Sequence, residues 1–402
     1  MGLASAVNKQ VALKEETVYG TLPTASGAQV MRRVDFAMNM AKDVYESNEL
    51  RSDLQVADMR HGVRRVSGTL NGELSPGSYQ PVLQAVMKRD FTAVTAIASL
   101  SITIAAAGPA WTLTRATGSW ITDGVRVGMV GRLTAGTFNA LNSNKNLYVV
   151  SITALALTVV ALNGTLLFAE GPIASATFSL PGRWTYVPTT GHTDKSFAIE
   201  EWFPDVPACE VYSGCKFTTA AIQLPPTGMA TCSFGVAGQD LKQRTTTRYY
   251  TTPTAAGTSG VVAAVNGVLR VGGVTLATVT GLNFDVAANY SGDPVVGANV
   301  VPLQFAGRVR VSGQFTAYFE DGVLRDVFAD ETQISLLVAL TTDNTAASNF
   351  VSFAMTRVKL GSADKGDAEG GIVRSYSFTA LLDTSGAGNE ATTLAVQDSL
   401  AV

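Results

Sequence analysis

One short motif occurs twice in this chain, 245 positions apart. Residues 62–68 read Gly-Val-Arg-Arg-Val-Ser-Gly and residues 307–313 read Gly-Arg-Val-Arg-Val-Ser-Gly, so five of seven positions are identical. Self-similarity over such a distance indicates that one structural unit was built twice. We therefore expect two like units, here called copy one and copy two, which lie side by side in the molecule.

Both copies continue the motif as a strand with one apolar and one polar face. Val66 and Leu70 alternate with polar residues in copy one, and Val311 and Phe315 do so in copy two. Alternation with period two is typical of a half-buried strand. The polar faces consist of Arg65, Ser67, Thr69, Asn71 and Glu73 in copy one and of Arg310, Ser312, Gln314, Thr316, Tyr318 and Glu320 in copy two.

A short amphipathic helix is predicted after each of these strands. Apolar residues at positions i, i+1, i+4 and i+5 form one stripe on a helix. The candidate N-caps are Ser75 or Ser78 before the first helix and Asp321 before the second. The two stripes are Val82, Leu83, Val86 and Met87, and Val323, Leu324, Val327 and Phe328.

A further match predicts a module that is inserted into copy one only. Residues 196–199 match 352–355, and residues 214–222 loosely match 371–381. Met87 and Ser196 are 109 positions apart, whereas Phe328 and Ser352 are 24 apart, a difference of 85. The pattern of short strands predicts a small all-β module over residues 92–182.

Two Asn-Gly pairs predict hairpin turns, Asn163-Gly164 inside the module and Asn266-Gly267 after copy one. The apolar stretch 151–169 has about the length of a membrane span, but the first of these turns favours a β-hairpin there. The predicted fold class is mainly β: two tandem β-sandwich or barrel domains, each with one short helix, and a small inserted β domain. The predicted domains are residues 1–91 with 183–242, residues 92–182, and residues 243–402.

Composition argues against several classes of function. Charged residues make up 15% of the chain and the net charge is −3, so no basic excess favours tight binding of nucleic acid or anionic lipid. The sequence contains no phosphate-binding glycine motif and no nucleophile elbow. We predict no enzymatic activity, no cofactor and no metal. Glu200, Glu201 and Asp240 are interpreted as surface charges.

The three cysteines are Cys209, Cys215 and Cys232. Their number is odd and none forms a CxxC pair, so the spacing does not predict a zinc site. Reduced, buried thiols in a protein assembled in the cytosol are the expectation.

Residues 38–61 form the most charged stretch of the chain. A solvated loop is one interpretation. The other is a long hairpin arm that contacts a neighbouring subunit or ring, whereas the counterpart segment in copy two, residues 287–306, is nearly uncharged. The charged residues of the arm are Lys42, Asp43, Glu46, Glu49, Arg51, Asp53, Asp58 and Arg60.

Several runs of sequence resemble the major tail tube proteins of long-tailed bacteriophages. The resemblance covers most of the chain outside 92–182. It implies a β-sandwich with a flanking helix, assembled as rings that stack into a hollow tube for the passage of genomic DNA from capsid to host. The runs that carry the resemblance are 48–53, 60–62, 67–77, 203–205, 224–228 and 307–331.

Because such tubes are commonly six-fold rings of a single-fold subunit, a duplicated chain suggests a homotrimeric ring with approximate six-fold symmetry. A homohexamer is the alternative. The partners implied are other copies of the chain, the tail terminator and tail-tip proteins, and the tape-measure protein and genomic DNA in the lumen without tight binding. No membrane is implied, and the expected location is the virion tail after assembly in the host cytoplasm.

The polar strand faces are expected to line the channel, with their arginines neutralised by nearby carboxylates, and the inserted module is expected to lie outside the tube. A β-rich receptor- or carbohydrate-binding protein is the alternative function. Exposed tryptophans would favour that alternative. Trp111 and Trp120 lie in the module, but core packing is the ordinary role of such residues.

Overall fold

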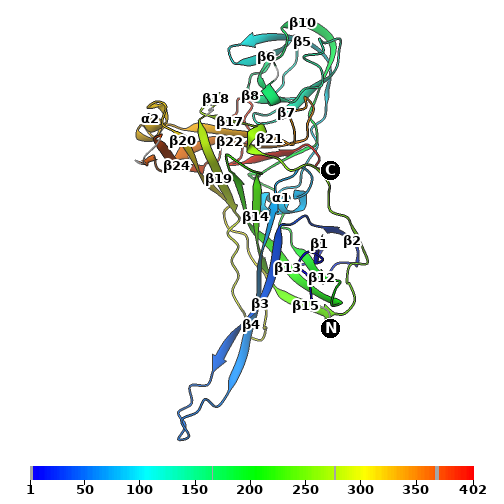
Figure 1. The fold of residues 1–402 in the computed structure, drawn as a ribbon, viewed down its shortest axis with the longest axis vertical. Helices are drawn as coiled ribbons and strands as arrows, with labels where there is room; N and C mark the ends of the chain where they lie inside the picture. Colours follow the sequence, from blue (N-terminus) through cyan, green and yellow to red (C-terminus); the bar gives the residue numbers. More distant parts are fainter. Residues whose placement is uncertain (1–2, 165, 276–277, 367–370) are drawn as a thin grey trace.

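The structure, a computed structural model, describes residues 3–164, 166–275, 278–366 and 371–402. Over these residues the chain is mainly β with two short α-helices, which confirms the predicted fold class (Figure 1). No helix in the described part is long and apolar enough to cross a membrane.

Copy one contains nine strands and a helix outside the inserted module, within the described residues. They are β1 (Gln10–Glu15), β2 (Ser26–Val30), β3 (Asp35–Glu46), β4 (Met59–Glu73), α1 (Gln80–Met87), β11 (Arg183–Tyr186), β12 (Phe197–Phe203), β13 (Ala208–Leu224), β14 (Thr231–Gly238) and β15 (Asp240–Thr245). A linker with β16 (Thr252–Thr254) and the 3₁₀-helix η2 (Ala264–Asn266) then leads to copy two.

Copy two follows with a similar set of elements. They are β17 (Gly267–Val271), β18 (Val274–Thr275), β19 (Val279–Ala287), β20 (Arg310–Tyr318), α2 (Val323–Ala329), β21 (Ile334–Thr341), β22 (Phe350–Leu360), β23 (Asp364–Lys365), β24 (Val373–Ala380) and β25 (Ala395–Asp398).

The two copies share one topology. In copy one β1 pairs with β2 and β12, β3 with β4, β4 with β14, and β13 with β12, β14 and β15. In copy two β17 pairs with β18 and β21, β19 with β20, β20 with β24, and β22 with β21, β24 and β25. Each of these strands therefore has a counterpart with equivalent neighbours, as expected for a duplicated unit.

The later sequence match is wrong by one strand. Residues 196–199 begin β12, whose counterpart is β21, whereas residues 352–355 lie in β22, the counterpart of β13. Small and apolar residues recur in neighbouring strands of each copy, so local similarity does not decide which strand is equivalent. Upstream, Phe36 pairs with Leu70 and Leu282 pairs with Phe315, so Leu282 is the counterpart of Phe36.

The predicted caps and turns were only partly right. The helix α1 follows Tyr79 without a side-chain cap, and the hydroxyls of Ser75 and Ser78 bond to each other at 2.7 Å. The carboxylate of Asp321 accepts the N–H of Val323 at 3.0 Å, but the residue at the N-cap position of α2 is Gly322. Neither Asn-Gly pair makes the predicted hairpin, because Asn163 and Asn266 lie in 3₁₀-helices. The hairpin of copy two joins β17 to β18 instead.

One sheet runs through both copies in the order β3–β4–β14–β13–β19–β20–β24 (Figure 1). The pairing of β13 with β19 joins the copies, with Thr219–Leu224 opposite Leu282–Ala287. One face of this sheet is covered by an outer layer that includes β12 and β1 in copy one and β21 and β17 in copy two. The core between the layers contains Leu70, Phe234, Ile222, Phe284, Phe315 and Phe378.

The inserted module forms a closed barrel in the order β10–β5–β6–β9–β8–β7. The sequence did not predict β5, and residues 166–169 are not a strand. The barrel packs on the outer layer of copy two, although its chain interrupts copy one. Its strands are β5 (Ile97–Ala107), β6 (Ala110–Arg115), β7 (Val130–Ala135), β8 (Leu147–Ile152), β9 (Ala156–Ala161) and β10 (Glu170–Ser179), with the 3₁₀-helix η1 (Leu162–Gly164) after β9.

Candidate assembly surfaces

The face of the shared sheet that points away from the core, here called the polar face, carries polar side chains and little charge. Strand register aligns its side chains in rows across both copies, because residues that face each other in neighbouring strands point to the same side. One row crosses seven strands and another crosses six without interruption. The first is Asp35, Asn71, Ser233, Ala221, Asp285, Ser312 and Thr379, and the second is Glu73, Thr231, Gln223, Asn283, Gln314 and Ser377.

The residues predicted to line a channel lie together on this face, apart from Glu320, which follows the end of β20. The carboxylate of Asp43 lies 3.9 Å from the guanidinium of Arg65. No ion pair joins Arg310 to a carboxylate among the described residues, although its charge acts on Asp285. The predicted neutralisation of arginines is therefore present at one of the two positions.

The segment 38–61 forms an arm, because β3 and β4 extend far beyond the rest of the sheet (Figure 1). Ion pairs at the arm join Arg51 to Asp53 at 2.9 Å and Arg60 to Asp58 at 2.8 Å. Exposed ion pairs of this kind contribute little stability. Its apolar side chains lack cover as well, and those that are exposed are Val44, Tyr45, Leu50, Leu54, Val56 and Met59.

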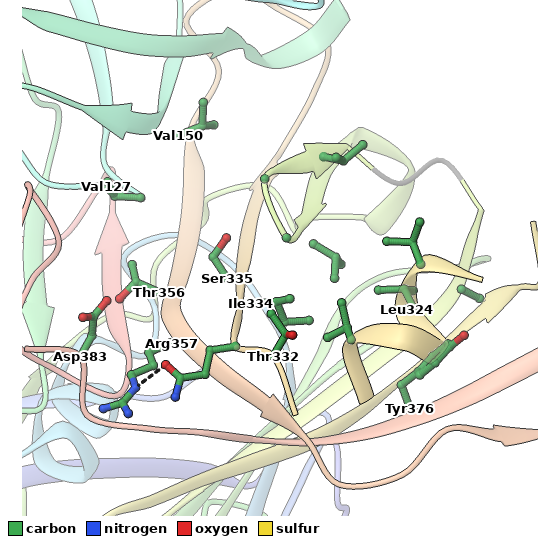
Figure 2. Close-up of a pocket in the computed structure, with 18 of the residues that line it drawn as sticks. Val127, Val150, Leu324, Thr332, Ile334, Ser335, Thr356, Arg357, Tyr376 and Asp383 are labelled. Carbon is green, nitrogen blue, oxygen red and sulfur yellow. Dashed lines mark hydrogen bonds between the residues drawn. The ribbon is translucent and has the colours of Figure 1, made fainter. Parts of the chain in front are cut away.

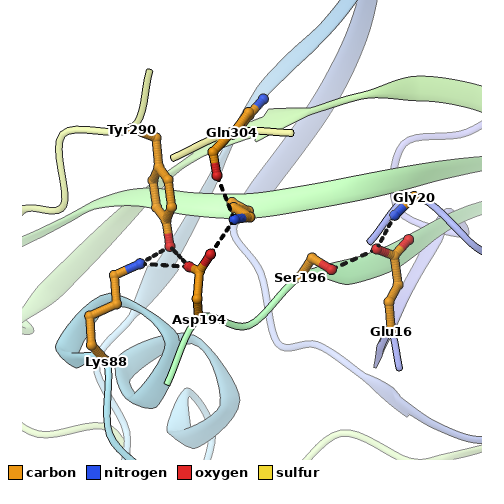
Figure 3. A network of polar contacts seen from close by, with 8 residues as sticks. Glu16, Gly20, Lys88, Asp194, Ser196, Tyr290 and Gln304 are labelled. Atoms are coloured by element: carbon orange, nitrogen blue, oxygen red, sulfur yellow. Dashed lines mark hydrogen bonds and ion pairs between the residues drawn. The ribbon is translucent and has the colours of Figure 1, made fainter. Parts of the chain in front are cut away.

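A cluster of charges with two buried lysines joins the two copies (Figure 3). The ammonium groups of Lys88 and Lys216 both contact the carboxylate of Asp194, Lys88 at 3.0 Å. Copy two completes the cluster, because the hydroxyl of Tyr290 donates to Asp194 at 2.8 Å and the carbonyl of Gln304 accepts from Lys216 at 2.7 Å. We call these five residues the junction cluster.

The junction cluster perturbs its ionisable groups. Burial lowers the pKa of the Lys88 ammonium, and Asp194 opposes this shift. Burial alone would raise the pKa of Asp194, but hydrogen bonds and charges from Lys216 and Lys88 hold that pKa below its ordinary value. The carboxylate is therefore ionised and fixed between two cations. Sequence reasoning missed this cluster because its members are scattered along the chain.

The C-terminal segment of copy two also contacts copy one. The side chain of Gln80 in α1 exchanges two hydrogen bonds with the backbone of Val402, at 2.7 and 3.0 Å. The N–H of Gly77 donates to the carboxylate of Asp398 at 2.7 Å. Burial raises the pKa of Asp398 to about 6, against the effect of the backbone donors.

The interpretation of three carboxylates as surface charges was wrong. Glu200, Glu201 and Asp240 are buried, and each is paired with a cation. Arg248 lies 3.0 Å from Glu200, Lys9 2.6 Å from Glu201, and Arg64 3.1 Å from Asp240. Buried charges require such partners, but the partners are distant in sequence and single-sequence reasoning has no signal for them.

A pocket of about 960 Å³ with mixed apolar and polar lining lies next to α2, between copy two and the barrel (Figure 2). Leu324 and Val327 line it from the helix, and Ile334 and Tyr376 line it from strands. In copy one the apolar stripe of α1 is fully buried, whereas the stripe of α2 is exposed or half-buried. The two copies thus share a fold but differ in how much of this surface is covered.

Several other features bear on alternative functions. Trp120 and Trp184 are buried, and Trp111 and Trp202 are half-buried. The described residues contain no group of three or more metal-ligating side chains. All three cysteines are free and buried.

The family model described as phage tail tube protein matches residues 6–380. A search of curated proteins found no match.

Proposed function

Because the chain belongs to the phage tail tube protein family and is thus a structural protein of the virion tail, we propose that three copies close into a ring and that stacked rings form a tube for DNA. The supporting observation is the β13–β19 pairing, which joins two like units into one sheet. If each unit spans one-sixth of a circle, three chains complete it.

The edges of the shared sheet support closure. β3 has one strand neighbour, β4, within the described residues. At the other end the sheet terminates in the pairings of β24 with β22 and β23. β3 is the counterpart of β19, and β22 is the counterpart of β13. By analogy with the β13–β19 pairing, β3 of a neighbouring chain would lie beside β22 and β23. Pairing there would satisfy the free backbone groups that make open edges prone to aggregation.

The polar face of the shared sheet would then line the lumen. Its rows hold Asn, Ser, Thr and Gln with few charges, and the net charge of the chain is −3. A wall of this type does not neutralise phosphates, so it would not hold DNA by release of counterions. We propose that the polar rows let the duplex slide.

The arm and the inserted barrel lie at opposite ends of the molecule (Figure 1). We propose that the arm tip, with exposed Leu50 and Leu54, contacts the next ring of the stack. The barrel packs on the outer layer of copy two, away from the polar face, and therefore belongs on the tube exterior. On this proposal the three predicted domains act as two ring segments and one external module.

Electron microscopy of the purified protein tests this function. Stacked rings with three-fold symmetry and a central channel are expected. Monomers or discrete spikes would overturn the proposal, and a ring of six chains would replace the trimer by the homohexamer.

A further inference from the structure

Copy two carries an exposed counterpart of one ion pair of the junction cluster, that of Lys216 with Asp194. Ser67 pairs with Ala237, which pairs with Lys216. In copy two Ser312, the repeat of Ser67, pairs with Thr379, which pairs with Lys359. Lys359 is therefore the counterpart of Lys216.

The acidic partner is repeated as well. Asp194 lies three residues before β12 and Glu331 lies three residues before β21, its counterpart. Glu331 contacts Lys359 at 2.5 Å. The side chain of Lys216 is 2% exposed, whereas that of Lys359 is 40% exposed. The lysine of this ion pair is thus buried where copy two covers copy one and exposed on the far side of copy two.

The segment that covers Lys216 identifies what would cover Lys359. Tyr290 and Gln304 lie in the connection between β19 and β20, which bridges Ser291 to Phe305. Phe36 corresponds to Leu282 and Leu70 to Phe315. At the same spacing along the chain, Ser291 and Phe305 correspond to Tyr45 and Arg60, which also lie opposite each other, in β3 and β4. Counting one position back from each gives Val44 and Met59 as the counterparts of Tyr290 and Gln304.

The base of the arm suits this role. Val44 and Met59 are exposed. Tyr290 and Gln304 contact Lys216 and Asp194 within the chain, whereas Val44 and Met59 have no such contact among the described residues. The adjacent charges of Glu46, Asp58 and Arg60 include both signs. They complement a lysine and a glutamate on the facing surface.

A second pair of positions shows the same asymmetry. The N–H of Leu74 donates to the carbonyl of Ala230, and at the repeated positions the N–H of Phe319 donates to that of Ile372. Leu74 and Ala230 are buried under Val262 of the linker, whereas Phe319 and Ile372 are exposed. At both places copy two therefore exposes surface whose counterpart in copy one is covered, once by the β19–β20 connection and once by the linker.

We propose that the Lys359–Glu331 surface binds the base of the β3–β4 arm from a second copy of this chain, at the position equivalent to that of the β19–β20 connection on Lys216 and Asp194. The inference rests on the proposed ring and names the contact that closes it. Copy one of the neighbour then sits on copy two as copy two sits on copy one.

Cross-linking of engineered cysteines tests this contact. The variant carries Val44→Cys and Glu331→Cys and is treated, after assembly, with a short bismaleimide that joins two thiols. The natural cysteines are buried and should not react. Denaturing gels are expected to show linked chains up to three and no further. Each single-cysteine variant should stay unlinked.

Two matched pairs serve as controls. Tyr290→Cys with Asp194→Cys should link within one chain, because these side chains touch across the internal junction. Leu50→Cys with Glu331→Cys places one thiol at the arm tip and should not link within a ring. Rings or tubes that assemble without a Val44–Glu331 link would overturn this contact and leave the proposed function standing.

The remaining outcomes are also informative. Products of up to six chains would support the contact and overturn the three-chain ring. If the unmodified protein forms neither rings nor tubes and the variant does not link, both the contact and the proposed function are overturned.

Discussion

At the residue scale, the same ion pair has different energetic weight in the two copies. Asp194 is surrounded by two buried ammonium groups, whereas Glu331 faces solvent with one. Removing the partner of a buried charge leaves that charge unsolvated, while an exposed pair is replaced by water at little cost.

Asp194→Asn should lower the free energy of unfolding by about 2 kcal/mol, less than for a fully buried pair because Asp194 is partly exposed. The matched control Glu331→Gln should have a clearly smaller effect in unassembled protein, because the Glu331 side chain is exposed. Denaturant titration of both variants measures the difference. Equal losses would contradict a special role for burial at the internal junction.

The pH dependence of Asp194 has a definite sign. Its pKa in the folded protein is lowered from 3.8, so the unfolded chain binds the proton more tightly. The stabilisation is therefore present above pH 3.8 and is lost as the pH falls through the native pKa. Asp194→Asn should remove this part of the acid sensitivity.

At the element scale, β21 explains why the inserted barrel stays in place. Leu336 and Val338 point into the core between the two layers, whereas Leu337 and Ala339 pack against the barrel. The strand is buried on both faces and its sequence is continuously apolar from Leu336 to Leu340, as is typical of such strands. The hydroxyl of Tyr148 adds a hydrogen bond to the carbonyl of Val338, at 3.2 Å.

Two glycines of the barrel separate backbone strain from docking. Gly128 and Gly124 both have φ of 90°. A Cβ on Gly128 would lie 2.2 Å from the Cβ of Ala354 in copy two, whereas on Gly124 it would meet nothing nearer than 3.7 Å. Gly128→Ala should therefore cost about 1–3 kcal/mol more than Gly124→Ala, because only the former overpacks the contact.

Thermal unfolding of the two variants measures this difference. We expect Gly128→Ala also to impair ring formation, since the barrel, whose chain is inserted in copy one, packs on copy two. Gly124→Ala should assemble normally. Equal stability and equal assembly would show that the barrel does not brace the junction.

The sequence was a good guide to elements and a poor guide to their partners. The alternation around Val66 and Val311 and the stripe of α1 follow from local periodicity, and both were predicted correctly. The correct equivalence of the strands and the burial of Glu200 could not be predicted in this way. The first depends on which distant strands pair, and the second on which distant cation lies next to the carboxylate. A single sequence does not contain this information.

At the scale of the whole molecule, the duplication makes two positions interchangeable. Thr69 and Gln314 occupy repeated positions on the polar face, and both are exposed. If the two copies alternate around one channel, a substitution at either position adds the same number of charges to each ring at the same distance from the axis.

Thr69→Lys and Gln314→Lys should therefore have equal effects. Each would add three positive charges per ring in the proposed trimer, and stacked rings would present them repeatedly to the DNA phosphates. We expect slower delivery of DNA into host cells and retention of short duplexes by purified tubes, with retention falling steeply as salt rises. Thr69→Gln and Gln314→Thr, which exchange the two natural residues, serve as controls and should leave both readouts unchanged. A strong effect at one position with none at the other would mean that only one copy borders the channel, and the approximate six-fold ring would then be wrong even if tubes form.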